Sequence, residues 1–191
     1  MKKINKTKPP PILFTNFTKK HKPKNWGDCI EITAELRNLM LNEEQNCQCA
    51  YCESAITSDD SKSHIDHYKR KAGHLFPELE FKYNNLLVSC NNRYRCAKHK
   101  DDNINKGDYD NLINPVTDNP DKHFDYSITG DILAKDKKAE KTIYMFNLNY
   151  ESLINRRKTL AFNIHGYRDQ FEMEEVIMVF GEYESFIRSI W

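Results

Sequence analysis

The chain has 191 residues, which is the length of one domain or of one domain with an appendage. With 39% hydrophobic and 12% aromatic residues it is too apolar to be disordered, and no run of about 18 apolar residues offers a transmembrane helix. The start is lysine-rich and lacks the apolar region of a secretory signal, so we expect a cytoplasmic protein without a membrane partner. A net charge of +1 at pH 7 does not favour general electrostatic binding of nucleic acid.

Charge is unevenly placed along the chain. Residues 1–27 hold eight of the 29 basic residues and no Asp or Glu, which leaves 21 basic and 28 acidic residues in the rest. The sequence Lys-Pro-Pro-Pro at 8–11 is typical of a polyproline II conformation. We therefore predict a basic, proline-containing arm over residues 1–27, which is either solvated or in contact with nucleic acid or a partner protein.

The first predicted helix spans about residues 28–44. Asp28 and Glu31 are spaced as a capping box, and Trp26 just before them is expected to be a packing anchor. Apolar residues then recur at helical spacing, which predicts a buried stripe. This stripe consists of Ile32, Leu36, Leu39 and Met40.

The rest of the chain divides into an irregular segment and a regular one. Residues 47–102 are rich in Cys, His and Asn without regular periodicity, as expected where metal–ligand bonds replace part of a core. Alternating residues around a Thr-Gly-Asp turn at 129–131 predict a β-hairpin over 124–133. The apolar face at the end of the chain is either core or a surface for a partner protein. The predicted helices of this segment span about residues 137–147 and 149–162, and residues 167–190 carry the apolar face, which is interrupted at Gly181.

Four of the six cysteines form two pairs that could hold one zinc ion. Cys49 and Cys52 have the C-x2-C spacing of a zinc knuckle, and Cys90 and Cys96 form a second, wider pair. In a reducing cytosol such pairs hold metal more often than they form disulfides. Because a four-thiolate shell has no open coordination position, we expect this zinc to be structural.

His99 offers an alternative zinc ligand, because Cys96 and His99 form a C-x2-H pair. We prefer the four cysteines, since Cys90 would otherwise be an idle thiol. Cys47 is expected to be a spectator, and Cys29 lies in the helical region and is expected to be ordinary core. A cysteine-based redox protein is a weaker hypothesis, because the C-x2-C motif lacks the βαβ setting of such proteins.

A candidate reactive segment, SHIDHY, occupies residues 63–68 between the two cysteine pairs. On a strand, alternation places His64 and Asp66 on one face and His67 on the other, unless the strand ends at Asp66. An Asp-His dipeptide by itself is typical of a buried or paired histidine. Its position between two zinc-ligand pairs makes it a candidate active site.

The order of these motifs resembles that of the zinc-bound HNH (ββα-metal) endonucleases. Within them, the resemblance is closer to the HNH protein of Septu anti-phage systems and of certain retrons. It covers most of the chain and is most specific over residues 47–102. The segments that carry it are CAYCE (49–53), HIDHYKRK (64–71), FPELEFKYNNLLVSCNN (76–92) and RCAKHKDD (95–102).

The resemblance implies a role for each matched residue. His67 would be the general base that takes a proton from the attacking water, and Asp66 would bind a catalytic divalent metal, Mg²⁺ or Mn²⁺. Asn85 would brace the loop that carries His67. The family pattern places the second ligand of this metal directly after the last cysteine, where this chain has Ala97, so His99 is the nearest substitute. Weaker candidates are Asn91, Asn92 and Asp101.

Basic residues surround this cluster in the sequence, and we expect them to contact phosphates of a nucleic acid. They are Lys69, Arg70, Lys71, Arg93, Arg95, Lys98 and Lys100.

We therefore predict an α+β fold with an HNH (ββα-metal) core, a structural zinc, a flanking N-terminal helix and a helical C-terminal extension with one β-hairpin. Residues 28–110 would form the zinc-bound nuclease core, and residues 111–191 the extension, packed on the core or on a partner. The predicted function is metal-dependent hydrolysis of phosphodiester bonds in DNA or RNA.

The resemblance implies an effector of a prokaryotic anti-phage system, which works with a partner ATPase or with a retron reverse transcriptase and its noncoding RNA. The alternative is a non-catalytic, zinc-organised module that binds nucleic acid or protein.

Overall fold

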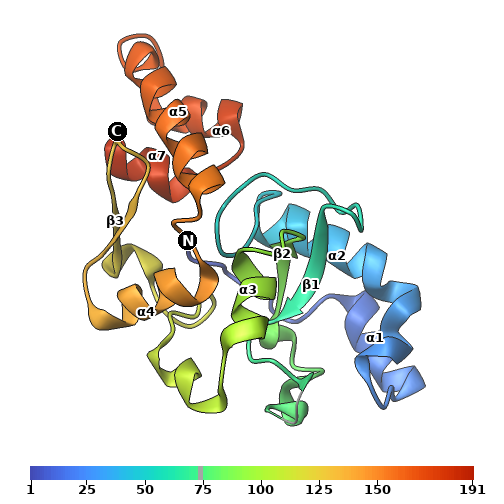
Figure 1. Ribbon diagram of the computed structural model, residues 1–191. Helices are drawn as coiled ribbons and strands as arrows, with labels where there is room; N and C mark the ends of the chain where they lie inside the picture. The colour runs from blue at the N-terminus through green and yellow to red at the C-terminus, as the bar shows by residue number, and fades with distance from the viewer. Residues whose placement is uncertain (73–74) are drawn as a thin grey trace.

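The computed structural model describes residues 1–72 and 75–191, which form a mixed α+β fold (Figure 1). Within these residues, no helix combines the length and the apolar character needed to cross a membrane. The strands are β1 (Ser63–His67), β2 (Leu86–Cys90), β3 (Phe124–Tyr126) and β4 (Ile132–Ala134). The helices are α1 (Ile12–His21), α2 (Ile30–Glu44), α3 (Cys96–Asn103), α4 (Lys137–Phe146), α5 (Glu151–Tyr167), α6 (Met173–Phe180) and α7 (Glu184–Ile190).

The centre of the fold is the antiparallel sheet of β1 and β2. Its register runs from Ser63 opposite Cys90 to His67 opposite Leu86. The sheet lies between α2 and α3 (Figure 1), and every residue of β2 is buried. The mostly apolar run of β2 is therefore that of a strand covered on both faces. A short loop leads from β2 into α3, so strand, strand and helix follow one another in the chain.

The N-terminal segment differs from the predicted arm. It contains a helix, α1, which packs on α2 and buries Phe14 and Phe17. Met1 and Ile4 are also buried, and the Met1 ammonium lies 2.5 Å from a carboxylate oxygen of Glu53. The lysines of this segment obscured its few apolar residues, which are the ones that attach it to the core.

The helix expected at about residues 28–44 is confirmed as α2, preceded by a 3-10 turn at Trp26–Cys29. Its capping differs from the prediction. The Asp28 carboxylate accepts the backbone N–H of Asn25 at 3.2 Å and so closes the 3-10 turn instead of pairing with Glu31. In the predicted stripe, Ile32, Leu36 and Met40 are buried and Leu39 is half-buried.

The predicted hairpin is confirmed as β3 and β4, and the two predicted helices as α4 and α5. Gly130 in the hairpin turn has a φ of +96°, and a Cβ there would lie 2.2 Å from the Ile154 carbonyl oxygen. The apolar segment at 167–190 forms α6 and α7, and the expected interruption is confirmed, because Gly181 ends α6 in the left-handed conformation. Helices α5, α6 and α7 pack together at the top of the view in Figure 1.

Candidate metal centre and active site

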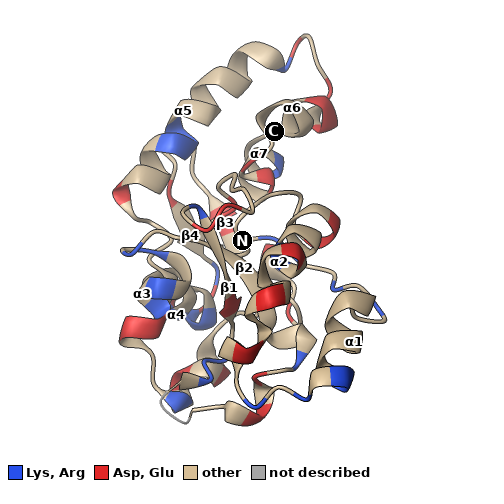
Figure 2. Ribbon diagram, turned by 90° about the vertical axis from the view of Figure 1, so that its right-hand side faces the viewer, with Lys and Arg blue, Asp and Glu red and all other residues tan. Residues whose placement is uncertain are grey.

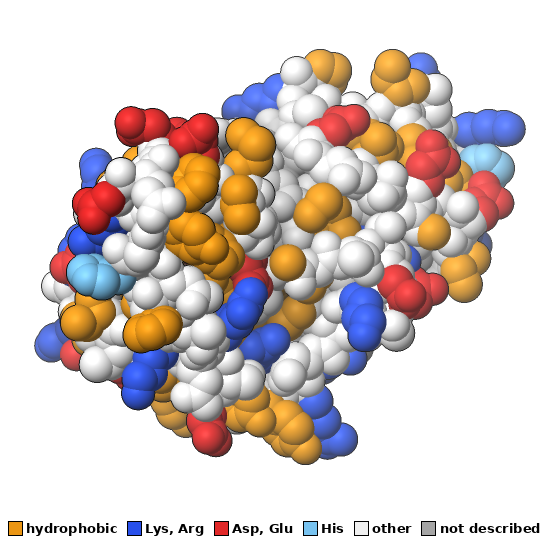
Figure 3. Space-filling view, turned by 90° about the horizontal axis from the view of Figure 1, so that it is seen from above, with side chains coloured by type: hydrophobic (Ala, Val, Ile, Leu, Met, Phe, Trp, Pro, Cys, Tyr) orange, Lys and Arg blue, Asp and Glu red, His pale blue; other side chains and the backbone are white. Residues whose placement is uncertain are grey.

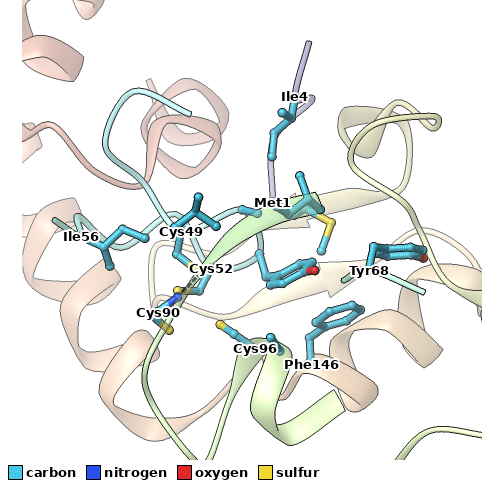
Figure 4. Close-up of a cluster of buried hydrophobic side chains, with 14 of the residues drawn as sticks. Met1, Ile4, Cys49, Cys52, Ile56, Tyr68, Cys90, Cys96 and Phe146 are labelled. Atoms are coloured by element: carbon cyan, nitrogen blue, oxygen red, sulfur yellow. Dashed lines mark hydrogen bonds between the residues drawn. The ribbon is translucent and has the colours of Figure 1, made fainter. Parts of the chain in front are cut away.

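The two cysteine pairs come together in the fold as predicted. All four thiols are buried, and their Sγ atoms lie within 4.8 Å of one another. In Figure 4 the labelled cysteines lie around one point, reached from the knuckle, from the end of β2 and from the start of α3. Among the described residues, no second group of three or more Cys, His, Asp or Glu side chains is arranged to hold a metal. The cluster consists of Cys49, Cys52, Cys90 and Cys96.

Backbone hydrogen bonds shape the knuckle and attach it to the sheet. The Glu53 N–H donates to the Cys49 carbonyl at 3.0 Å, which closes the turn. The Ala50 N–H donates to the Val88 carbonyl at 3.0 Å, and the Cys90 N–H points at the Cys49 sulfur at 3.3 Å. Because N–H groups stabilise thiolates, this geometry suits a metal-bound sulfur.

The donor set fits zinc, since four buried thiolates are the ligands of a closed structural site. His99 does not join them, because its Nδ1 lies 2.9 Å from the Met145 carbonyl oxygen, so the alternative ligand set is wrong. Cys47 is exposed and Cys29 is buried in the core, as predicted. A bound zinc would fix the knuckle, the end of β2 and the start of α3 to one another.

Arg95 lies beside the sulfur cluster. Its Nε is buried and has no hydrogen-bond partner among the described residues. Burial opposes the charge of the guanidinium, but the thiolates of Cys52 and Cys90 raise the pKa of Arg95 overall. A tetrathiolate zinc centre has a net negative charge, so this guanidinium would partly neutralise it. Arg95 therefore belongs to the metal centre more than to a phosphate-binding rim.

Asp66 lies on the face of β1 that is covered by α3. Its side chain is 4% exposed, and its carboxylate accepts the Tyr51 hydroxyl and the Lys100 ammonium, the latter at 3.0 and 3.3 Å. Burial raises the pKa of Asp66, but Lys100 and Tyr51 together bring it below its ordinary value. Asp66 is thus the ionised partner in a buried ion pair.

The predicted site for catalytic Mg²⁺ or Mn²⁺ is not assembled around Asp66. His99 is turned toward α4, and Ala97 is buried and offers no ligand atom. Because the Asp66 carboxylate is already neutralised, the residues present do not fit a divalent cation. Of the weaker candidates, Asn91 is hydrogen-bonded to His64 and Asn92 to the Tyr94 N–H. One Asp101 carboxylate oxygen lies 3.2 Å from the Lys100 ammonium but has no hydrogen-bond partner among the described residues.

His67 lies on the opposite face of β1 and is 6% exposed. Its Nε2 is 2.9 Å from the Glu80 carbonyl oxygen, and the Trp26 ring stands edge-on to the imidazole with 4.8 Å between ring centroids. Because a carbonyl only accepts, we assign the proton to Nε2, which leaves Nδ1 as the acceptor of the neutral ring. Burial lowers the pKa of His67, and the bond to Glu80 opposes this only in part. The imidazole is therefore neutral near pH 7.

Asn85 connects the segment after β1 to the loop before β2. Its Oδ1 accepts the Lys69 N–H at 2.8 Å, and its Nδ2 donates to the carbonyls of Lys69 and Leu79 at 3.0 and 3.2 Å. Leu79 precedes Glu80, whose carbonyl holds His67. The amide of Asn85 thus fixes the two segments that determine how the imidazole is oriented.

The predicted basic rim is only partly at the surface. Lys100 is fully buried, so the prediction that it contacts phosphate is wrong. Arg93 and Lys98 are exposed near α3. Figure 2 shows Lys and Arg interspersed with Asp and Glu over the fold. The other members of the predicted rim, Lys69, Arg70, Lys71 and Arg95, are half-buried.

Two contributors to these contacts were not indicated by the sequence. Tyr51 lies between Cys49 and Cys52 in the sequence and is fully buried. An aromatic residue in an otherwise polar knuckle was the feature of the sequence that could have indicated this burial. Glu80 acts on His67 through its backbone carbonyl, which no side-chain motif indicates. Its carboxylate accepts the backbone N–H of Trp26 at 2.7 Å and so anchors the residue whose ring packs against His67.

Comparisons with known proteins relate the chain to the Septu group. It is similar to the Septu protein PtuB of Bacillus mycoides strain KBAB4, with 30% identity over 154 residues, or 68% of this chain and 52% of PtuB. It is also similar to the Septu protein PtuA of that strain, with 26% identity over 159 residues, or 68% of this chain and 21% of PtuA. The matches thus span about half of PtuB and about a fifth of PtuA. No family model matches the chain.

Proposed function

We propose that the chain is an HNH-type nuclease of a Septu-type anti-phage defence system and hydrolyses phosphodiester bonds of DNA or RNA. The observation that carries the proposal is a neutral His67 whose Nδ1 makes no hydrogen bond within residues 1–72 and 75–191, oriented by the Glu80 carbonyl and by the loop that Asn85 braces. Similarity to PtuB and PtuA supports the Septu context. The nuclease activity is supported by the motif resemblance and by the sequence of β1, β2 and α3 around the cysteine cluster.

In this proposal His67 is the general base. Its Nδ1 takes a proton from water while the water oxygen bonds to phosphorus and the bond from phosphorus to the leaving oxygen breaks. The exposed Arg93 and Lys98 supply positive charge for phosphates of the substrate. The Trp26 ring packs edge-on against the imidazole and helps to fix its orientation. The zinc holds the fold and takes no part in the chemistry.

The second candidate is a zinc-organised binding module without catalysis. The observation that favours it is the buried Asp66–Lys100 pair, in which Asp66 stabilises the fold instead of holding a reactive cation. Asp66 and His67 also point to opposite faces of β1, so they do not converge on one phosphate in this arrangement.

Cleavage assays on two histidine variants separate the candidates. Zinc-loaded protein is incubated with plasmid, single-stranded DNA and RNA, in the presence of Mg²⁺ or Mn²⁺ and in their absence. The nuclease proposal expects cleavage that His67→Ala abolishes while the variant keeps its zinc and stays folded, with only the loss of stability that truncation of a buried ring causes. The matched control is His64→Ala on the same strand, which should keep the activity. Destabilisation by His67→Ala, with no cleavage by the wild type, would favour the binding module.

We further propose that the chain works with a partner protein of the defence system. The side chains of Phe162, Met178 and Val179 are 84%, 80% and 78% exposed. Figure 3 shows hydrophobic side chains gathered over the part of the surface formed by α5, α6 and α7. Apolar patches of this kind are typical of protein-binding surfaces.

The resemblance implies an ATPase as this partner, and co-purification tests the surface. Phe162→Ser and Met178→Ser should release the ATPase without changing the melting temperature, because neither side chain belongs to the core. The control is Ile30→Ser, since Ile30 is 81% exposed on α2, away from the patch. Retention of the ATPase by the α5 and α6 variants would assign the contact to another surface.

A further inference from the structure

The Lys100 ammonium has an unusual environment. It projects from α3 onto the end of β1, and its side chain is fully buried. Besides the Asp66 carboxylate, the Nζ contacts the carbonyl oxygens of His67 at 3.0 Å and Tyr68 at 2.9 Å, and it lies 3.2 Å from a carboxylate oxygen of Asp101. Burial removes the hydration of a lysine ammonium, and contacts with oxygen atoms offset this loss of free energy. Here all three N–H groups of Lys100 have oxygen acceptors.

Without the Lys100 ammonium, this arrangement of oxygens would suit a metal cation. It combines a carboxylate with two backbone carbonyls, which are hard ligands of the kind that Mg²⁺, Mn²⁺ and Ca²⁺ prefer. The distances of 2.9 to 3.3 Å are those of N–H···O hydrogen bonds and exceed the roughly 2.1 Å of Mg–O bonds. The ammonium thus provides the positive charge that Asp66 requires.

The pair is also held in place from both sides. On one side the Tyr51 hydroxyl donates to Asp66, and Tyr51 stands between two cysteines of the cluster. On the other side Lys100 lies one turn after Cys96, the first residue of α3 and a member of the same cluster. Withdrawal of Lys100 would therefore require α3 to shift relative to the knuckle that the zinc fixes.

We propose that Lys100 is a built-in counter-ion that occupies the cation position at Asp66, so that the chain holds no divalent metal there. This inference rests on the proposed function, because it specifies the metal requirement of the same site. The nuclease chemistry of the chain then depends on His67 and not on a metal bound to Asp66. Asp66 is then one partner of a structural ion pair and not the metal ligand that the sequence resemblance implies.

Binding of Mn²⁺ tests the proposal without any activity measurement. The loss of the free Mn²⁺ signal in electron paramagnetic resonance is measured on zinc-loaded wild type, Asp66→Asn, Lys100→Met and the double variant Asp66→Asn/Lys100→Met. We expect wild type and Asp66→Asn to bind Mn²⁺ equally weakly. Lys100→Met should bind it about tenfold more tightly or better, because Asp66 is then free to act as a ligand, and the double variant should lose this gain.

Each outcome decides the proposal. Mn²⁺ binding by wild type that Asp66→Asn removes would overturn it, and so would a folded Lys100→Met that binds no better than wild type. If Lys100→Met fails to fold, the comparison of wild type with Asp66→Asn still decides whether Asp66 holds a cation. Failure of the nuclease proposal is seen separately, as absence of cleavage by the wild type whatever its Mn²⁺ binding.

Discussion

The cysteine unit (residues 47–103) and the C-terminal helices (residues 137–191) are stabilised by different interactions. The first has irregular loops, four clustered thiols and a buried ion pair, with one short sheet and one short helix. The second is helical, and its buried side chains are mainly apolar. Where a region lacks long regular elements, metal–ligand bonds and ionic contacts replace part of the apolar burial. The two regions should therefore respond to different perturbations.

Glu53 joins the two regions. Its backbone carbonyl accepts the Tyr183 N–H at 2.8 Å, and its carboxylate accepts the Ser185 N–H at 2.8 Å at the start of α7. The same carboxylate pairs with the Met1 ammonium. Because Glu53 directly follows Cys52, it connects the knuckle to α7 and to the N-terminus.

Zinc removal should have the largest effect and should act first on the cysteine unit. Structural zinc contributes about 10–16 kcal/mol in zinc-finger peptides, so a strong chelator should abolish cooperative melting. Hydrogen exchange read by mass spectrometry should show early loss of protection over residues 47–103 and later loss in α5. Added Zn²⁺ should restore both. Equal melting temperatures with and without chelator would contradict a structural zinc in the cysteine cluster.

Asp66→Ala should have the next largest effect, because it leaves the Lys100 ammonium buried without its partner. We expect a loss of about 3–5 kcal/mol in the free energy of unfolding, measured in urea. Asp102→Ala on α3 is the control, since Asp102 is exposed and should change stability by less than about 0.5 kcal/mol. A small loss for Asp66→Ala would mean that the ion pair is not tightly buried.

Gly130→Ala tests the contact of the β3–β4 turn with α5, where shape and not charge should decide stability. The φ of +96° and the approach of the Ile154 carbonyl leave no room for a Cβ, so we expect a loss of about 2–4 kcal/mol. Gly166→Ala in α5 is the matched control, because a Cβ there meets no atom within 4 Å. That variant should gain about 0.5–1 kcal/mol from helix propensity. Equal effects of the two substitutions would contradict the turn geometry.

The same contrast between regions explains how much could be predicted from the sequence. In the hairpin and the C-terminal helices the sequence periodicity extends over many residues, so the hairpin, α4 and α5 were predicted, although α5 continues to Tyr167 and not to about residue 162. The four cysteines were also found, because zinc ligands have characteristic spacing.

The contacts of the candidate site depend on tertiary packing and could not be predicted in this way. Lys100 was expected at the surface because lysine usually is, but α3 directs it onto β1. In α1, the lysines made a helix with only a few apolar side chains look like a solvated arm. The strand alternation of Asp66 and His67 was visible in the sequence, whereas the partner of each side chain was not.

The smallest expected effect concerns the pH dependence of the buried histidines on β1. Burial lowers the pKa of His67, so between its folded-state value and the unfolded value of about 6.5 the unfolded state binds more protons. Stability should therefore fall as the pH drops below about 6.5.

His67→Gln should flatten this part of the profile of unfolding free energy against pH. His64→Gln should do so as well, because burial also lowers the pKa of His64. If His67→Gln retained the wild-type slope, the imidazole would be solvated in solution and not covered by Trp26.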